Sequence, residues 1–598
     1  MDAVDRDIEK AERDAASPHH YPPQFQSVTR RSTTASSSSA SSSSSSSAST
    51  ASGRMSRIPT QGDTLERNPT ALSRIQTARS QHSATVGRPL GVKSRDDRRP
   101  LPAMGAGKEF PPLLPEREEY VVEFDGEHDE LHAQNWPMKK KLYTAVILGY
   151  TTFVAAFASS IFSVATVPVS RHFQVSTEVG LLGLCLYVLG FATGPTLWAP
   201  LSELRGRRLP LIVSMFGFSI FQVAVAAGKD LQTVLLCRFW GGFFGACPLA
   251  VVAAVFADMF NNRQRGLAIT VFSMTVFTGP LMAPFIGGFI LENASLGWRW
   301  TEWVTAILGW LAFILNLLFL QETYPPVILV SKAAELRRRT KNWGIHAKQE
   351  EIEVDFYQLI TQNFSRPLRL LFTEPIVLFI TIYMSFIYGL LYLFLTAYPI
   401  VFQQIRGWKP GVAGLPYFGM IIGQLLAGGM IIAWQPLYNR KLKANNDIPI
   451  PEWRLPPVVI GGVAFTAGLF WFGWSGYRAD IHWIAPTLSG LLTGFGLLSI
   501  FLQSLNYLVD AYLMFAASAI AANTLLRSIA GAGFPMFSQY LFKRLGVNWA
   551  STLLGFIALA MVPIPVVFVV YGAKIREHSK FAPTMKVRSE DEGEERVV

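Results

Sequence analysis

The chain has 598 residues, of which 50% are hydrophobic and only 16% are charged, which is unusually apolar for a soluble protein. A net charge of +11 is compatible with nucleic-acid binding, but the basic residues lie in short clusters between apolar blocks, which argues against it. The 3 cysteines form no CxxC or Cys/His cluster, so neither a disulfide framework nor a zinc site is indicated, and we expect no cofactor.

The amino-terminal segment, residues 1–118, is rich in Ser, Thr, Arg and Pro and contains a serine tract near Ser37–Ser49. Such a composition buries too little apolar surface to form a core. We therefore expect a disordered cytosolic tail. Arg31-Ser32 and Arg79-Ser80 place serines beside basic residues, so a phosphorylated regulatory arm is a second interpretation that is compatible with the first.

Twelve apolar blocks of roughly 20 residues follow, each long enough to cross a ~30 Å hydrocarbon core as a helix. They lie at 142–167, 179–200, 209–227, 233–257, 266–290, 301–320, 374–402, 412–436, 456–476, 482–508, 515–540 and 549–573. Several contain Gly and Pro, which membrane helices tolerate. The first block begins too far into the chain for a cleaved secretory signal. We predict a multi-pass membrane protein.

Basic residues mark one side of the predicted spans. They precede the first span and follow spans 2, 4, 6, 8 and 12, as Lys139–Lys141, Arg205, Arg207, Arg208, Arg263, Arg265, Lys332, Arg337–Arg339, Lys341, Arg440, Lys441, Lys443, Lys574 and Arg576. The positive-inside rule makes this side cytosolic, so both termini are expected in the cytosol. Lys543-Arg544, after span 11, is the exception. The expected location is the plasma membrane, with the vacuolar membrane as the alternative.

The long segment between spans 6 and 7 divides the spans six and six. We predict two six-helix bundles, a cytosolic connector between them and a cytosolic carboxyl-terminal tail, at 136–321, 374–573, 322–373 and 574–598 respectively. In the connector, Leu329, Ala333 and Leu336 follow helical spacing among basic residues, which predicts an amphipathic helix at the inner headgroups. The fold class is an all-α membrane protein in which two bundles alternate access to a midplane site. We expect it to be monomeric.

The loop after span 2 confines a carboxylate, a turn glycine and clustered arginines to very few residues, in Gly194-Pro-Thr-Leu-Trp-Ala-Pro-Leu-Ser-Glu-Leu-Arg-Gly-Arg-Arg208. This sequence resembles the signature of major facilitator transporters, and its form is similar to that of the fungal twelve-span drug:proton antiporters, including the polyamine-exporter-like branch. The resemblance implies the two-bundle fold.

The same loop predicts a gate made by Glu203, Gly206, Arg207 and Arg208. Glu203 can accept hydrogen bonds from the first turn of span 11 or pair with an arginine, and either contact would hold the cytosolic side shut. Asp258, at the inner end of span 4, would complete a charge relay by reaching Arg207 or Arg263. The alternative is that these charges only set orientation and cap the loop.

Arg238 lies about one and a half turns inside span 4, where a guanidinium is costly and marks a functional site by default. It matches the arginine motif of the family's fourth span, which the resemblance associates with proton handling. The alternative is that Arg238 only fixes helix packing through carbonyl groups. No Asp or Glu lies near the middle of a span, so Glu302, near the outer end of span 6, and the Glu203/Asp258 network are the candidates for proton coupling.

Span 5 carries Gly279-Pro-Leu-Met-Ala-Pro-Phe-Ile-Gly-Gly288, which resembles the antiporter signature with Ala283 in place of a usual glycine. Its site residues are Gly279, Pro280, Gly287 and Gly288. Small residues at this spacing allow close helix approach, and proline bends the helix. The resemblance favours export, and ordinary small-residue packing is the alternative.

Span 11 carries Asn523 and Arg527 four residues apart, hence on one helix face. The pair resembles the Asn-x-x-x-Arg element of the polyamine-exporter-like branch. Arg527 is close to mid-bilayer, so it must face a cavity or a partner. The sequence Glu322-Thr-Tyr-Pro-Pro is a further match, and the resemblance covers roughly residues 136–573.

Together these features predict a secondary active transporter, not an enzyme, whose partners are a small-molecule substrate, protons and the lipid bilayer. We expect it to export a secondary metabolite, drug or organic acid in exchange for protons. A polyamine or organic-cation exporter and an uncoupled facilitator or uptake carrier are the alternatives; buried arginines would repel polyamines. Asn293, in an Asn-Ala-Ser sequon after span 5, is a candidate glycosylation site on the outer side.

Overall fold

The computed structural model of the chain describes residues 120–126, 128–293, 295–351, 356–445, 450–512, 515–579 and 581. The side chains of residues 262, 263 and 356–364 are not described. The predicted tail at 1–118, with its serine tract, and residues 582–598 of the predicted carboxyl-terminal tail lie outside the described residues.

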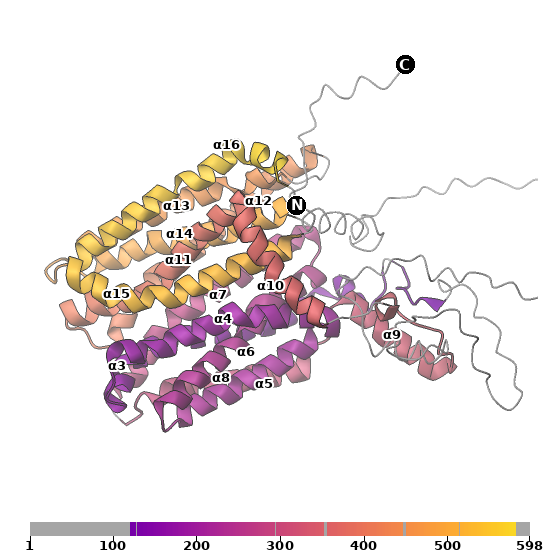
Figure 1. The fold of residues 1–598 in the computed structure, drawn as a ribbon, viewed down its shortest axis with the longest axis horizontal. Coiled ribbons are helices and arrows are strands. Elements are labelled where there is room, and N and C mark those ends of the chain that lie inside the picture. Colours follow the sequence, from indigo (N-terminus) through magenta and orange to yellow (C-terminus); the bar gives the residue numbers. More distant parts are fainter. Residues whose placement is uncertain are drawn as a thin grey trace, which may run out of the picture. The chain divides into compact units, whose positions relative to one another are not determined.

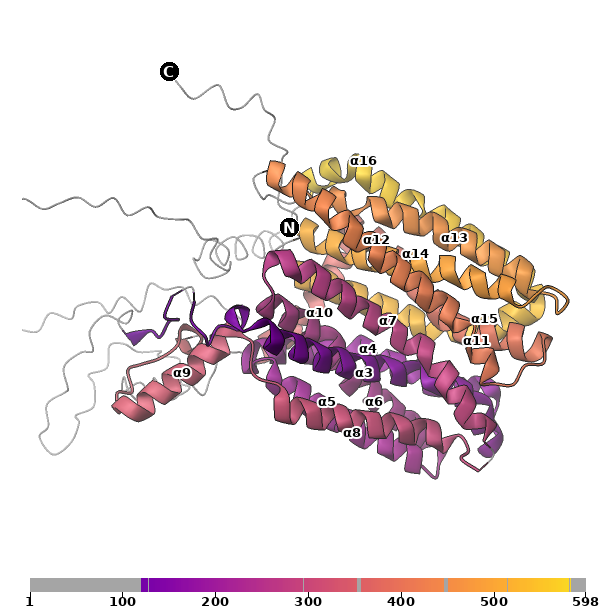
Figure 2. The ribbon, with the colours of Figure 1, turned by 180° about the vertical axis from the view of Figure 1, so that it is seen from behind.

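Six long helices form the first half of the described chain: α3 (Met138–His172), α4 (Thr177–Arg205), α5 (Arg208–Ala227), α6 (Leu231–Met259), α7 (Asn262–Glu292) and α8 (Arg299–Phe319). Within this half α4 packs on α6, α3 packs on α7, and α5 packs on both α6 and α8 (Figure 2). Each helix begins and ends within a few residues of a predicted apolar block, because those blocks supply the surface that the bundle and the hydrocarbon cover.

The second half contains α11 (Pro375–Pro399), α12 (Tyr417–Ala444), α13 (Pro456–Gly476), α14 (Ile484–Tyr512), α15 (Ala516–Met561) and α16 (Pro563–Glu577). A π-helical segment, Ile400–Ile405, continues α11, and short 3-10 helices at Val412–Gly414 and Pro451–Arg454 precede α12 and α13. Here α13 packs on α14, α11 packs on α15, and α12 packs on α14 (Figure 1).

The 46-residue helix α15 is interrupted at Gly546, whose φ of 74° and ψ of 166° are not helical. Before this residue α15 runs along α11, where Asn523 donates to Met384 and Thr396 donates to Ser538. After it the chain runs back along α13, where Trp474 donates to Thr552. Among the described residues, eleven apolar helical stretches are long enough to span a membrane, and the last, Ala516–Glu577, is long enough to cross twice because it reverses at Gly546. The prediction of twelve crossings in two six-helix halves is confirmed.

Helix ends define two faces of the bundle. We call tail-side the face at which α3 begins and α4 and α6 end, and far the opposite face, which holds Gly546 and the end of α7. The two halves meet along α4 with α15 and along α7 with α12. At the far face Tyr540 donates to Glu178 and the amide of Gly411 donates to Glu292; near the middle, Tyr392 donates to Ser159 over 2.9 Å.

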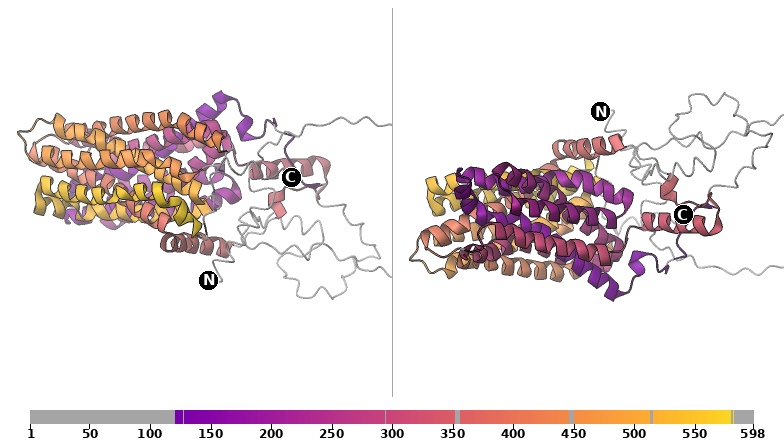
Figure 3. Two further views of the ribbon diagram at one scale, coloured as in Figure 1. Left: turned by 90° about the horizontal axis from the view of Figure 1, so that it is seen from above. Right: turned by 90° about the horizontal axis from the view of Figure 1, so that it is seen from below.

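The connector contains α9 (Pro325–Thr340), a 3-10 turn at Lys348–Glu351, and α10 (Phe356–Thr373), which touches both α4 and α15. In Figure 3, α9 lies beyond the tail-side ends of the bundle helices. Its buried Ala333 clusters with Val122 and Ala347, and Leu329 and Leu336 pack against that cluster. Protein therefore covers part of this face, and contact of α9 with the inner headgroups stays a prediction.

The segment that precedes the first bundle helix supplies part of that cover. Val122 donates its amide to the carbonyl of His346, and the amide of His346 donates to Tyr120. Arg337 and Glu350 form a buried bidentate ion pair with both N–O distances at 2.7 Å. The connector is thus a small packed unit with its own core, held to the residues that lead into α3.

Candidate functional site

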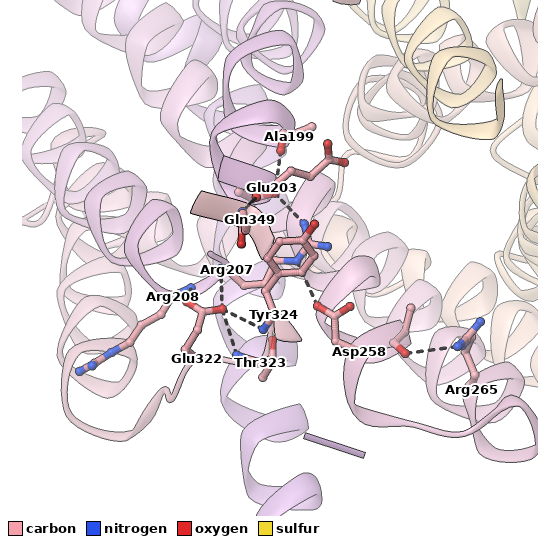
Figure 4. A network of polar contacts seen from close by, with 12 residues as sticks. Ala199, Glu203, Arg207, Arg208, Asp258, Arg265, Glu322, Thr323, Tyr324 and Gln349 are labelled. Carbon is pink, nitrogen blue, oxygen red and sulfur yellow. Dashed lines mark hydrogen bonds and ion pairs between the residues drawn. The ribbon is translucent and has the colours of Figure 1, made fainter. Parts of the chain in front are cut away.

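The predicted gate gathers around Arg207 at the tail-side face (Figure 4). Its Nε lies 3.1 Å from Asp258 Oδ2, and it donates to Ser202 Oγ over 2.8 Å. The guanidinium also lies 4.6 Å from the ring centroid of Tyr324. Burial raises the pKa of Tyr324 to about 12, so its ring remains a neutral partner for the cation at physiological pH. The end of α4, the end of α6 and the connector therefore meet at one arginine.

Glu322 holds the start of α5 and is the main residue that sequence reasoning did not assign. Its carboxylate accepts the amides of Arg207 and Arg208 over 2.8 and 3.1 Å, and those of Thr323 and Tyr324 over 3.0 Å each. An anion at a helix amino terminus satisfies exposed amides and interacts favourably with the helix dipole. The sequence indicates the motif that contains Glu322, but its spacing does not indicate that Glu322 accepts the amides of Arg207 and Arg208, more than one hundred positions earlier in the chain.

Gly206 explains why the loop after span 2 needs glycine. Its φ is +86°, and a Cβ there would collide with the Glu322 carboxylate. Arg208, by contrast, is exposed and donates to the carbonyl of Leu317 over 3.2 Å.

Glu203 is not bonded in the way that the gate hypothesis requires. Among the described residues its carboxylate has no hydrogen-bond or ion-pair partner, and in Figure 4 it points away from the Arg207 guanidinium. Only its backbone carbonyl is engaged, by the Gln349 side chain over 3.2 Å. The structure therefore brings Arg207 to Asp258 but does not place Glu203 on the first turn of α15 or on an arginine, and the Arg263 side chain lies outside the described residues.

Arg238 is fully buried and fully engaged. Its Nε donates to the carbonyl of Gly183 over 3.0 Å, and both terminal nitrogens donate to the carbonyl of Ala158 over 3.1 Å. The guanidinium lies 4.5 Å from the ring centroid of Tyr187 and 4.8 Å from that of Phe162. Elements α3, α4 and α6 are thus joined through this one cation.

Glu302 of α8 provides the countercharge. Its Oε2 lies 3.5 Å from an Arg238 terminal nitrogen, and both side chains are 0% exposed. Its other oxygen, Oε1, is buried and has no hydrogen-bond partner. The carboxylate can therefore accept a proton on Oε1 without losing a hydrogen bond. Sequence reasoning proposed both residues for proton handling separately, and the structure places them in one pair.

Arg527 has different surroundings. Its guanidinium lies 4.8 Å from the ring centroid of Phe501 and 5.4 Å from that of Tyr388, two rings that are in contact with each other, and the residue is partly accessible. Its Nε is buried without a partner. One turn earlier, Asn523 donates to Met384 over 3.2 Å, while its carbonyl oxygen has no partner.

Tyr388 and Tyr392 of α11 lie where the halves meet. Their hydroxyls are 3.4 Å apart, and Tyr392 reaches Ser159 of α3. Tyr398 instead stacks between Tyr417 and Phe472 inside the second half.

The span 5 motif packs α7 against α3. A Cβ at Gly279 would lie 2.9 Å from the amide nitrogen of Phe157, and one at Gly287 would lie 2.7 Å from Val164. Pro284 has no amide to bond the carbonyl of Pro280, and Ser160 of α3 donates to that carbonyl over 2.8 Å instead. The motif thus allows close helix contact, and α3 supplies the hydrogen bond that the proline removes.

The last two positions of interest on α7 lie toward the far face. A Cβ at Gly288 would lie 2.5 Å from the carbonyl of Pro410, so this glycine permits contact with the second half. Asn293, the sequon residue, is exposed at the end of α7, and its side-chain oxygen accepts the Ser295 hydroxyl over 2.7 Å.

The second half has its own tail-side cluster, which sequence reasoning missed. Arg454 lies 2.9 Å from Asp510 and 3.7 Å from the ring centroid of Tyr438. This repeats the arrangement of arginine, aspartate and tyrosine around Arg207. The available signal was that Asp510 occupies the end of span 10 as Asp258 occupies the end of span 4. In the described part of the chain, no group of three or more His, Cys, Asp or Glu side chains is placed to hold a metal ion.

Comparison with known proteins agrees with this geometry. Residues 148–535 match the family model described as Major Facilitator Superfamily. The chain is 45% identical over 514 residues to the major facilitator superfamily multidrug transporter FLU1 of Candida albicans, covering 86% of this chain and 84% of that protein. It is likewise 45% identical over 535 residues to the multidrug transporter TPO1_2 of Candida glabrata, covering 88% and 92%.

Solved structures show the same fold at low sequence identity. A proton:xylose symporter, XylE, superposes with a TM-score of 0.52 at 16% identity, covering 73% of this chain and 97% of that one. A peptide transporter, POT, gives the same TM-score at 15% identity, covering 77% and 99%.

Proposed function

Because this chain belongs to the Major Facilitator Superfamily, we propose that it exports small organic or amphiphilic molecules by alternating access, in exchange for protons. The chain is a multi-pass membrane transporter and not an enzyme, and its resemblance to the fungal twelve-span drug:proton antiporters is confirmed by the multidrug transporters that it matches. We further propose that the tail-side face is cytosolic, as the basic residues there indicate, in a plasma-membrane protein that works as a monomer.

The buried pair of Arg238 and Glu302 is the observation that carries proton exchange. The Glu302 side chain has no contact with solvent, and its Oε2 lies 3.5 Å from Arg238. Its other oxygen, Oε1, has no partner, so it can take up a proton without breaking a hydrogen bond. Protonation would weaken its attraction to Arg238, whose carbonyl bonds join α3, α4 and α6. In this proposal the proton therefore changes how those three helices are held together.

Alternation of access is supported by where the halves are bonded. Hydrogen bonds tie the halves at the far face through Glu178 and Glu292, while the Glu203 carboxylate at the tail-side face is unused. This arrangement fits a transporter whose far side is closed. In the opposite state, Glu203 would accept amides from the first turn of α15 and close the tail side.

The substrate is identified first, by profiling metabolites in the medium and in the pellet of cells that lack the protein. A compound retained in those cells is the solute for reconstitution. In proteoliposomes, the wild-type protein should accumulate it against its gradient when a pH difference is imposed. Glu302→Gln should lose this accumulation yet keep solute-for-solute exchange, because exchange needs no net proton movement.

Glu203→Gln tests the gate, and Glu335→Gln, which neutralises an exposed carboxylate of α9 outside the gate, is its control and should leave turnover unchanged. We expect Glu203→Gln to reduce turnover more than equilibrium binding. Transport by the wild-type protein that ignores the pH difference would favour an uncoupled facilitator. Accumulation by Glu302→Gln equal to that of the wild type would remove this residue from the proton pathway.

A further inference from the structure

Arg527 differs from the other arginines that the bundle or the connector buries at least partly, because no described residue gives it a hydrogen bond or an ion pair. Arg265, Arg299 and Arg406 have no carboxylate either, but each donates to a backbone carbonyl. Arg207, Arg238, Arg337, Arg454 and Arg576 each pair with an acidic side chain, at 3.1, 3.5, 2.7, 2.9 and 2.8 Å. Among the described residues, Arg527 has no ion pair and no hydrogen bond, and its Nε is buried. Burying an unpaired cation among membrane helices is energetically costly unless another polar or negatively charged group binds it.

The groups around Arg527 are aromatic and come from both halves. Phe501 and Tyr388 contact each other and both lie beside the guanidinium, and Phe277 of α7 lies 4.6 Å from Phe501, edge to face. Gly531, one turn beyond Arg527, has no side chain, and a Cβ there would lie 2.9 Å from Tyr388. The glycine therefore lets the Tyr388 ring lie against α15, next to the cation.

Polar groups with unused capacity complete the surroundings. The side-chain oxygen of Asn523, one turn before Arg527, has no partner, and the hydroxyls of Tyr388, Tyr392 and Ser159 form a chain that crosses from α11 to α3. One unpaired cation, flat apolar rings and a few hydroxyls match a molecule that has one anionic group and an apolar body.

We propose that Arg527 binds the carboxylate of an amphiphilic organic monoanion whose apolar part lies among Tyr388, Phe501 and Phe277. This inference rests on the proposed function and specifies its substrate class. The guanidinium offers parallel N–H donors that fit the two charged oxygens of a carboxylate; a neutral amide can accept them only at one uncharged oxygen, and an ammonium cannot accept them at all. Because Phe277 and Ser159 belong to the first half, a ligand bound here contacts both bundles. A polyamine would meet an uncompensated positive charge at the same place.

The test is equilibrium binding to the purified full-length protein, without a pH gradient, using 2-naphthoate, 2-naphthamide, 2-naphthylmethylammonium and spermidine. These naphthyl probes share one apolar body and differ in charge. We expect the wild-type protein to bind 2-naphthoate at least about tenfold more tightly than 2-naphthamide, the scale of one charge-assisted contact. Arg527→Gln should abolish that preference and leave 2-naphthamide binding unchanged, and Arg527→Lys should keep part of it.

Arg406→Gln is the matched control, because Arg406 lies at the far face and donates only to carbonyl groups such as that of Ile481. It should keep the wild-type preference. Equal binding of naphthoate and naphthamide, no naphthoate binding at millimolar concentration, or tighter binding of either cation would overturn the proposal. The wild-type series decides the matter even where Arg527→Gln fails to fold.

The two proposals fail separately. Proton-driven accumulation of a neutral or cationic solute, without a naphthoate preference, would contradict the anion site but not proton-coupled export. A clear naphthoate preference without any pH-driven flux would contradict proton exchange but not the anion site.

Discussion

Arg238 and Arg527 are both arginines inside membrane helices, and the structure surrounds them in opposite ways. Arg238 bonds two backbone carbonyls and a carboxylate and is 0% exposed. Arg527 contacts two aromatic rings and has no hydrogen-bond partner among the described residues. Each cation also has one tyrosine beside it, Tyr187 or Tyr388. The difference teaches that burial alone does not reveal the role of an arginine. An arginine with protein hydrogen-bond partners holds helices together, whereas one without such partners has donors left to bind a ligand.

The largest effect should follow from removing Arg238. Arg238→Gln leaves Glu302 buried without its countercharge, and breaking a buried pair in this way costs roughly 3–5 kcal/mol. Thermal unfolding of the purified protein in detergent should fall accordingly, and pH-driven transport should be lost. The double variant Arg238→Gln/Glu302→Gln should recover part of the stability but none of the transport. A single variant as stable as the wild type would show that the pair is not what holds these helices.

Arg527→Gln should have a smaller effect on stability, of the opposite sign. It removes a cation that no side chain compensates, so we expect the free energy of unfolding to stay equal or rise by about 1 kcal/mol. The same thermal unfolding measurement checks this. Destabilisation as large as that of Arg238→Gln would mean that Arg527 is held by an internal partner, and the contrast between the two arginines would disappear.

Tyr187→Phe should cost about 1 kcal/mol. Its hydroxyl is buried and donates to the carbonyl of Ala155 over 2.9 Å, and a typical hydrogen bond of this kind contributes about that much. The ring beside Arg238 stays in place. Thermal unfolding again provides the readout, and an unchanged midpoint would show that the hydroxyl adds nothing to the packing of α3 on α4.

Tyr388→Phe should have the smallest effect, below about 0.5 kcal/mol, because its hydroxyl reaches Tyr392 only over 3.4 Å. The ring that faces Arg527 remains, so naphthoate binding should change by no more than a few fold. A loss as large as that of Arg527→Gln would transfer the anion contact from the guanidinium to the phenol.

Much of the fold follows from the sequence, because apolar blocks of membrane length leave the backbone little choice but helix. The reversal after span 11 was expected as a loop between 540 and 549, whereas the structure turns at Gly546 alone. The packing of α9 was not foreseen, because spacing reveals an apolar face but not what covers it. Here Val122 and Ala347, far apart in the chain, provide the cover.

The site could be predicted where two residues pair because they have opposite charges and lie at a similar depth in the membrane. Arg207 and Asp258 end neighbouring helices on one face, and Arg238 and Glu302 lie at similar depth, so their meeting follows from alternating topology. Glu322 could not be assigned, because its partners are backbone amides, which leave no mark in a sequence. The surroundings of Arg527 could not be assigned either, because spacing does not show that Phe501 and Tyr388 are the side chains beside its guanidinium.

The turn at Gly546 also limits how the last two membrane crossings can move. With one residue between them and no linker to absorb displacement, neither helix can slide along its axis past the other without breaking its own backbone ladder. The connection from α13 to α14, through residues 477–483, carries no such restraint. Spans 11 and 12 therefore cannot shift independently along their axes, so an axial displacement of the helix that carries Arg527 is passed on to residues 547–561.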